Sequence, residues 1–80
     1  MRKIVVLDRG WILVGHLEQD GDWFLMINCS VVRRWGTTKG LGELAECGPL
    51  KDTILDKQPL TKFHRDQIKM IISCNEDKWK

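Results

Sequence analysis

The segment Arg33–Gly40, which reads Arg-Arg-Trp-Gly-Thr-Thr-Lys-Gly, is the most informative cluster in this chain for binding an anion. Three cations, two hydroxyls and two glycines before an expected helix N-terminus are the groups that hold a phosphate. An indole in the same segment can stack on a base. The alternative is that Trp35 belongs to the core and the two arginines are a solvated strand edge. The predicted ligand residues are Arg33, Arg34, Trp35, Thr37, Thr38 and Lys39, with His64 and Arg65 extending the basic rim.

Other reactive residue types in the sequence do not form a recognisable catalytic or metal site. Gly40–Ala45 fits the dinucleotide fingerprint G-x-G-x-x-A, but 80 residues with an antiparallel hairpin leave no room for the βαβ fold that uses it. The two histidines and three cysteines lack the spacing of a zinc site or of a nucleophile pair. We therefore expect no catalytic residues, no metal, no cofactor and no enzymatic activity.

Tryptophan is the preferred aromatic residue, with four Trp against two Phe and no Tyr. Exposed Trp is common at interfaces and stacking platforms. We expect Trp11 and Trp23 to pair across a hairpin, as core or as a subunit interface. Trp79 is expected to anchor the C-terminal tail on the body of the protein or on a neighbouring subunit.

Length and composition indicate one small globular domain, residues 1–80, with a charged tail at 75–80. The chain is 42% hydrophobic and 30% charged, inside the globular range. A domain of this size buries only roughly 60% of the surface that its unfolded chain exposes, so a homo-oligomer is expected. Its 13 Lys and Arg against 11 Asp and Glu do not indicate a polybasic nucleic-acid binder. Apolar runs are too short for a membrane span, and no signal peptide is recognisable, so a cytoplasmic location is expected.

The pattern of apolar residues predicts a mainly β, α+β fold with one short helix. Strands are expected at 3–7, 11–18, 22–28, 31–35, 53–55 and 68–73, with a break near 29–30 and a turn at 63–66. Asp20-Gly21 is a strong hairpin signal. Both faces of that hairpin are apolar, which requires a barrel packed against a helix, or a second subunit. Gly15 lies in mid-strand, where a chain bends or another backbone approaches closely.

The expected helix covers about residues 40–47, with Thr37 or Thr38 as its N-cap and Gly48-Pro49 as its stop signal. It has barely two turns, so it must dock through Leu41 and Leu44 to be stable. The predicted architecture is a small curled antiparallel sheet, or an SH3-like or Sm-like barrel, carrying this helix.

Four segments together resemble a family of short, functionally uncharacterised proteins of bacteriophages and prophages: Trp11–Glu18, Asn28–Trp35, Leu41–Ala45 and Ile68–Cys74. The resemblance implies a viral or mobile-element origin, which would place the protein in the host cytoplasm. The order of strands, with a mid-strand glycine, is also similar to bacterial Sm-like RNA chaperones, which form curled SH3-like barrels and assemble into rings. This chain lacks their N-terminal helix and has a long insertion before the last strand, so the similarity favours the barrel more than RNA binding.

The sequence thus predicts a non-enzymatic, phage-derived protein that binds and sequesters a phosphate-bearing nucleotide. One concrete ligand is a nucleotide second messenger of antiviral defence. A first alternative is an inhibitor or adaptor that binds a host defence protein through its Trp-rich surface, and a second is Sm-like RNA binding.

Overall fold

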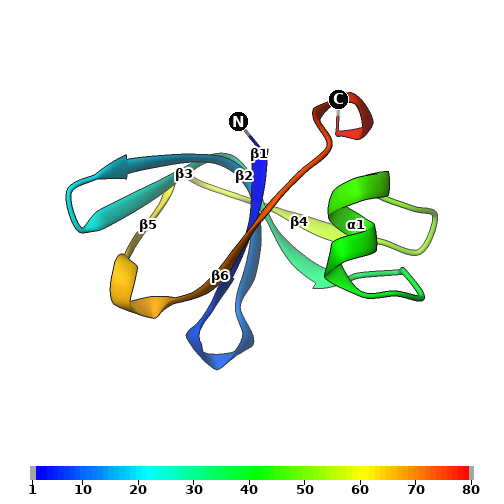
Figure 1. The fold of residues 1–80 in the computed structure, drawn as a ribbon, viewed down its shortest axis with the longest axis horizontal. Helices are drawn as coiled ribbons and strands as arrows, with labels where there is room; N and C mark the ends of the chain where they lie inside the picture. Colours follow the sequence, from blue (N-terminus) through cyan, green and yellow to red (C-terminus); the bar gives the residue numbers. More distant parts are fainter. Residues whose placement is uncertain (1, 80) are drawn as a thin grey trace.

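The computed structural model describes residues 2–79, so the first and last residues of the expected domain lie outside the described part. The strands are β1 (Arg2–Leu7), β2 (Ile12–Asp20), β3 (Trp23–Arg34), β4 (Ile54–Gln58), β5 (Thr61–His64) and β6 (Ile68–Ser73), and the helix is α1 (Leu41–Cys47). This arrangement confirms the mainly β class with one short helix (Figure 1). No helix in residues 2–79 is long and apolar enough to cross a membrane.

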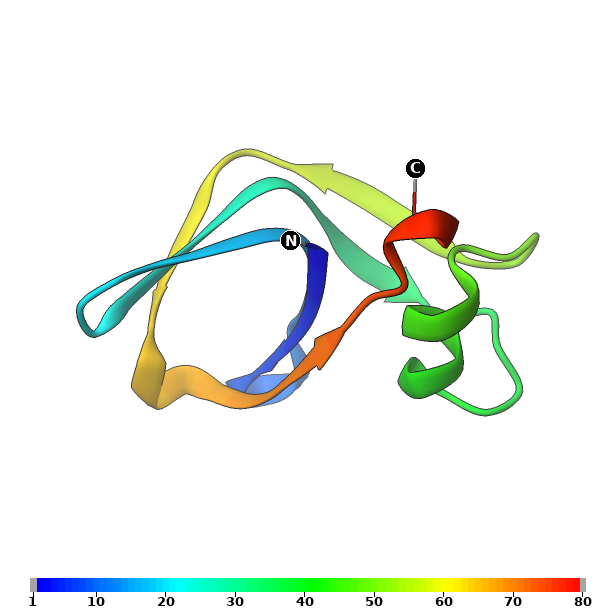
Figure 2. The ribbon, with the colours of Figure 1, turned by 45° about the horizontal axis from the view of Figure 1, so that its top comes forward.

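All strand pairs are antiparallel, and the strands lie in the order β4-β3-β2-β1-β6. The twelve-residue β3 pairs with β2 on one side, and on its other side its first half pairs with β5 and its second half with β4. Figure 2 shows that the sheet curls on itself without closing, while α1 lies outside the curl beside the C-terminal turn. The curl of the sheet follows from this long strand, which bends between the part paired with β5 and the part paired with β4.

Both faces of the sheet are buried, as the two-sided hairpin requires. Alternate residues of a strand point to opposite faces, and Leu13 joins a cluster inside the curl with Val5, Met26 and Phe63. The residues on either side of Leu13 face α1 instead, in a second cluster. An 80-residue chain therefore divides its apolar side chains between two small cores.

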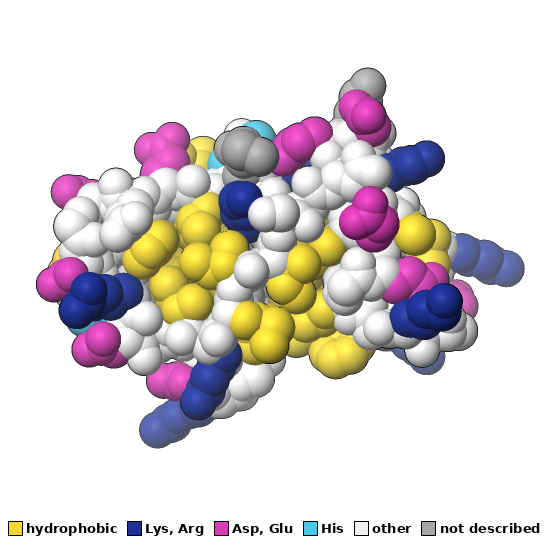
Figure 3. Space-filling view, viewed as in Figure 1, with side chains coloured by type: hydrophobic (Ala, Val, Ile, Leu, Met, Phe, Trp, Pro, Cys, Tyr) yellow, Lys and Arg dark blue, Asp and Glu magenta, His cyan; other side chains and the backbone are white. Residues whose placement is uncertain are grey.

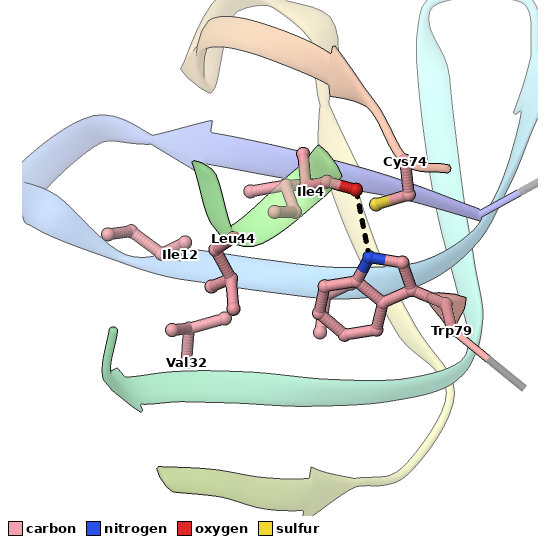
Figure 4. Packing of buried hydrophobic residues seen from close by; sticks show 8 residues of the cluster. Ile4, Ile12, Val32, Leu44, Cys74 and Trp79 are labelled. Atoms are coloured by element: carbon pink, nitrogen blue, oxygen red, sulfur yellow. Dashed lines mark hydrogen bonds between the residues drawn. The ribbon is translucent and has the colours of Figure 1, made fainter. Parts of the chain in front are cut away.

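The cluster under α1 is closed by the C-terminal tail. Leu44 is fully buried against Ile4 and Val32, and Trp79 is only 5% exposed (Figure 4). The indole nitrogen of Trp79 donates a hydrogen bond of 3.0 Å to the backbone oxygen of Ala45 in α1. Because the tail caps the helix that the sheet supports, Trp79 is anchored on its own protomer and is not available to a neighbour.

Three local expectations are wrong. No break occurs near residues 29–30, because β3 continues through them with a bulge. The expected turn at 63–66 is instead the end of β5 followed by a single 3₁₀ turn, Arg65–Gln67. Trp11 precedes β2 and Trp23 lies opposite Asp20, so the two indoles do not pair across the hairpin.

Replacing Trp79 should be far more costly than replacing Trp11. Trp79→Ala removes a buried indole and its hydrogen bond, and we expect a loss of about 3–5 kcal/mol in the free energy of unfolding. Trp11 is 58% exposed, and its replacement by Ala should change this free energy by less than about 1 kcal/mol. Urea denaturation followed by circular dichroism measures both values; equal losses would contradict the anchoring role of Trp79.

Candidate functional site

The predicted anion segment has one of its two arginines engaged within the chain. Arg33 forms a two-point ion pair with Asp56 of β4, with contacts of 2.8 and 3.3 Å. An exposed pair of this kind contributes less than about 1 kcal/mol to stability, but it neutralises the guanidinium. Arg34 is exposed and has no ion-pair partner within residues 2–79. The two neighbours are therefore not equivalent.

The donors that precede α1 are occupied by the chain itself. The Glu43 carboxylate accepts hydrogen bonds from the Lys39 backbone N–H at 2.8 Å and from the Thr38 hydroxyl at 3.3 Å. The Thr37 hydroxyl donates to the Gly40 carbonyl at 2.7 Å. The N-cap residue is Gly40, which provides no side-chain cap. The expectation that Thr37 or Thr38 caps the helix is therefore wrong. A carboxylate thus already lies where a phosphate was predicted.

Trp35 remains partly accessible, with 41% of its surface exposed. Its carbonyl accepts a 2.7 Å hydrogen bond from the Thr53 hydroxyl, which fixes the segment against the start of β4. The ring lies against Gly40, where a Cβ would come within 3.7 Å of it. The structure therefore brings Trp35 together with the loop, and leaves Lys39 at the surface beside it.

The predicted basic rim does not join this segment. His64 ends β5 and lies opposite Trp23, the first residue of β3, whereas Arg33 and Arg34 end the same long strand. The His64 imidazole meets the Trp23 ring edge-on at 5.0 Å and accepts the Asp66 N–H. Arg65 pairs with Asp22 at 3.5 Å. The two sets of predicted residues lie at opposite ends of β3 (Figure 1).

A pocket of about 250 Å³ opens instead between the sheet, the loop after α1 and the C-terminal tail. We call it the bulge pocket. It combines polar side chains with apolar walls and an indole, and its lining residues are Arg2, Val14, Asn28, Ser30, Pro49, Leu55 and Trp79. A mostly apolar concave site with a few polar groups is typical of small-molecule binding.

The position of Asn28 in this pocket results from a β-bulge. Val14 pairs with Ser30 and His16 pairs with Ile27, so two residues of β3, Asn28 and Cys29, lie opposite Gly15 of β2. Asn28 has a φ of 49°, in the left-handed region that Asn tolerates better than most residues. Such bulges redirect side chains and recur next to functional sites.

Gly15 is the residue that permits the bulge. A Cβ at this position would lie 2.7 Å from the Cβ of Cys29 and 2.8 Å from its Cα. Only glycine allows the two backbones to approach so closely. The mid-strand glycine seen in the sequence thus marks the place where β3 departs from regular pairing.

Arg2 supplies the positive charge of the bulge pocket. Its backbone N–H donates to the Glu76 carboxylate at 2.9 Å, which ties the start of β1 to the tail. Its guanidinium carbon lies 6.0 Å from the centre of the Trp79 ring. Within residues 2–79 the guanidinium has no ion-pair partner. A guanidinium without an ion-pair partner, on a half-buried residue and beside an indole, is suited to an anionic ligand.

Sequence reasoning missed Arg2, Asn28 and Ser30, which lie far apart in the chain. Their signal was weak: Gly15 in mid-strand, followed by an Asn near the expected end of the return strand. Trp79 was singled out as an anchor on the body of the protein or on a neighbour, but not as the wall of a pocket. The meeting of the first strand, the bulge and the tail is visible only in the folded chain.

The cysteines and histidines form no reactive centre in the described part of the chain. No group of three or more His, Cys, Asp or Glu is placed to hold a metal ion there. Cys29 and Cys74 are buried and Cys47 is exposed. Burial, with a smaller contribution from the Glu76 charge, raises the pKa of the Cys74 thiol to about 11. Cys74 is therefore a protonated, inert packing residue at neutral pH.

Comparison of the sequence with known family models and with curated proteins gives no match. Interpretation of the bulge pocket therefore depends on its own geometry and chemistry.

The close approach at Gly15 predicts opposite effects of one substitution at two glycines. Gly15→Ala introduces a clash with Cys29 and should lower the free energy of unfolding by about 1–3 kcal/mol. Gly42 is exposed in α1 with nothing within 4 Å of an added Cβ, so Gly42→Ala should raise it by about 0.5–1 kcal/mol. Chemical denaturation compares the two, and an unchanged stability for Gly15→Ala would contradict the bulge geometry.

Thiol exposure predicts that a single cysteine reacts in the native protein. At pH 8 an alkylating reagent should modify one thiol per chain, and Cys47→Ser should abolish this reaction. In denaturant all three thiols should react. Mass spectrometry counts the modifications; rapid native labelling of Cys74 would be inconsistent with its burial and its raised pKa.

Proposed function

We propose that this protein binds a phosphate-bearing nucleotide in the bulge pocket and acts by sequestering it, without catalysing a reaction. The observation that carries the proposal is the Arg2 guanidinium, uncompensated by any carboxylate of residues 2–79 and set beside the Trp79 indole. The proposed ligand is therefore anionic at one end and flat and apolar at the other.

The chemistry of the lining supports a phosphate at the polar side of the pocket. A guanidinium offers paired N–H donors that match phosphate oxygens. The Asn28 amide and the Ser30 hydroxyl add donors, and neither makes a side-chain hydrogen bond to another residue of the described chain. No lining residue is a carboxylate, an imidazole or a thiol. The pocket thus offers groups for binding and no general base.

The apolar side of the pocket supports a base or another flat ring. Val14, Leu55, Pro49 and Trp79 form this side. At about 250 Å³ the pocket lies just below the usual range of about 300–1,000 Å³ for small-molecule sites. It fits a mononucleotide that remains partly exposed, or one nucleotide of a larger ligand.

Sequestration is the role we propose for this binding. A protein that removes a signalling nucleotide needs affinity and abundance but no catalytic group. The resemblance to short phage proteins supports a nucleotide second messenger of antiviral defence as the ligand.

A second candidate function is supported by three exposed indoles outside the pocket. Trp11, Trp23 and Trp35 are each more than 40% exposed, and such residues are enriched in protein interfaces. An inhibitor or adaptor that binds a host defence protein would use them. In that case nucleotides would leave the melting temperature unchanged.

Thermal-shift and calorimetric titration with mononucleotides, cyclic dinucleotides, the matching nucleosides and inorganic phosphate test the proposal. We expect at least one nucleotide to raise the melting temperature by mass action, and its nucleoside to bind more weakly. Arg2→Gln removes charge-assisted hydrogen bonds of about 1.5–3 kcal/mol, which corresponds to a loss of affinity of about 10- to 150-fold. Asn28→Asp, which keeps size and backbone preference, should weaken binding by charge repulsion.

Two control variants separate the bulge pocket from the segment predicted from sequence. Arg34→Gln and Lys39→Gln remove the exposed, unpaired cations near Trp35 and should leave nucleotide affinity within about twofold, because surface charges act weakly at a distance. If these variants abolish binding and Arg2→Gln does not, the nucleotide binds at Arg33–Gly40. If no nucleotide binds, the proposed function fails.

A further inference from the structure

The sheet ends in two open edges, which differ in the charged and apolar side chains that they carry. Within the described residues one edge is formed by β4 and β5, which pair with the two halves of β3, and the other edge by β6, which pairs only with β1. β4 carries Lys57, an exposed charge with no ion-pair partner within residues 2–79, beside Asp56, which is paired with Arg33. Charged side chains on an edge strand oppose its pairing with another chain. The β4 edge is therefore protected.

The β6 edge has no comparable protection. Its only charged residue, Lys69, is drawn back toward its own chain by an ion pair of 3.4 Å with Asp8. Met70 is 53% exposed and Ile71 is 43% exposed, and they point to opposite faces of the sheet. Figure 3 shows hydrophobic side chains on the face of the molecule that β6 crosses in Figure 1. An apolar, unprotected edge of this kind is a pairing surface.

Backbone geometry determines which groups of β6 are free. The Cys74 N–H donates to the Arg2 carbonyl at 3.2 Å, and Ile71 lies opposite Val5 in the same register. In an antiparallel pair, hydrogen-bonded and non-hydrogen-bonded residues alternate. Met70 and Ile72 therefore bond to β1, while the N–H and C=O groups of Ile71 and Ser73 point away from it toward the open edge.

We propose that β6 pairs with β6 of a second copy, antiparallel, about a two-fold axis at Ile71. Ile71 then exchanges both backbone hydrogen bonds with its counterpart, and Ser73 lies opposite Lys69 of the second copy. The same register sets Met70 against Ile72 of the other chain on the face that α1 covers. The outward groups of Ile71 and Ser73 and the exposed apolar residues all find partners, and no like charges lie opposite one another.

Pairing of β6 with β6 of a second copy fits this edge better than pairing of β6 with β4 of a second copy. Joining β6 to β4 head to tail would put Met70 and Ile71 beside the charged residues of β4. The two-fold arrangement puts Ile71 opposite Ile71 and Met70 opposite Ile72 of the other chain, in the reciprocal contacts that an isologous interface requires. The two sheets then form one continuous sheet, and additional apolar surface is buried by a chain too small to bury much alone.

Light scattering coupled to size exclusion tests the dimer on the full chain over a wide range of concentration. We expect twice the 9.3 kDa chain mass at high concentration. Ile71→Lys puts two like charges at the axis and removes two apolar side chains from the interface, which together should raise the dissociation constant about 100-fold or more. Leu60→Lys is the matched control, because Leu60 is also exposed but lies between β4 and β5; it should leave the dimer intact.

Hydrogen exchange gives a second measurement that needs no variant. The Ile71 amide points to the open edge and should exchange slowly in concentrated protein and quickly on dilution. A monomer at every concentration overturns the proposal, as does an assembly larger than a dimer or a dimer that survives Ile71→Lys. β6 supplies no residue to the bulge pocket, so the dimer and nucleotide binding succeed or fail separately.

Discussion

The structure depends on the need to cover both faces of one short, curled sheet. Leu13 faces the inside of the curl, and its neighbours Ile12 and Val14 face α1. A flat sheet would expose one of these faces to water. The chain covers one by curling and the other with a seven-residue helix and the tail. Because α1 is too short to be stable alone, the helix, the tail and the sheet stabilise one another.

The β-bulge of β3 opposite Gly15 connects this packing requirement to the candidate site. The close approach of β2 and β3 at Gly15 accommodates an extra residue in β3. The bulge places Asn28 in the same pocket as Arg2, at the start of β1. The tail reaches the same end because Trp79 must cover the core under α1. Arg2 arrives there as the first described residue of β1. A single defect in regular pairing and a single anchored indole thus form the bulge pocket.

Charge compensation distinguishes the two regions that contain potential anion ligands. In Arg33–Gly40, Asp56 pairs with Arg33 and Glu43 accepts from the Lys39 backbone and the Thr38 hydroxyl, while the Arg34 and Lys39 side chains remain exposed at the surface. In the bulge pocket, the Glu76 carboxylate accepts a hydrogen bond from the backbone N–H of Arg2. The guanidinium of Arg2 has no ion-pair partner within residues 2–79. Counting cations along the chain therefore favoured the first region, although only the second combines an unpaired cation with a concave surface.

Local patterns were sufficient for the β-rich class, the hairpin at Asp20-Gly21 and the helix near residues 40–47, because alternation, turn residues and helix stops act over a few neighbours. They also identified both faces of the hairpin as apolar and Gly15 as an unusual strand residue. The continuity of β3 through residues 29–30 was not predictable in this way, since a bulge exists only relative to the partner strand.

Which cations are neutralised, and where Trp79 docks, depended on residues distant in sequence. Arg33 meets Asp56, and Trp79 meets Ala45, only after the strands have paired. The sequence by itself determined the kinds of elements and their apolar faces. The tertiary structure decided which charge stays uncompensated and which indole lines a pocket, because both depend on contacts that chain folding alone brings together.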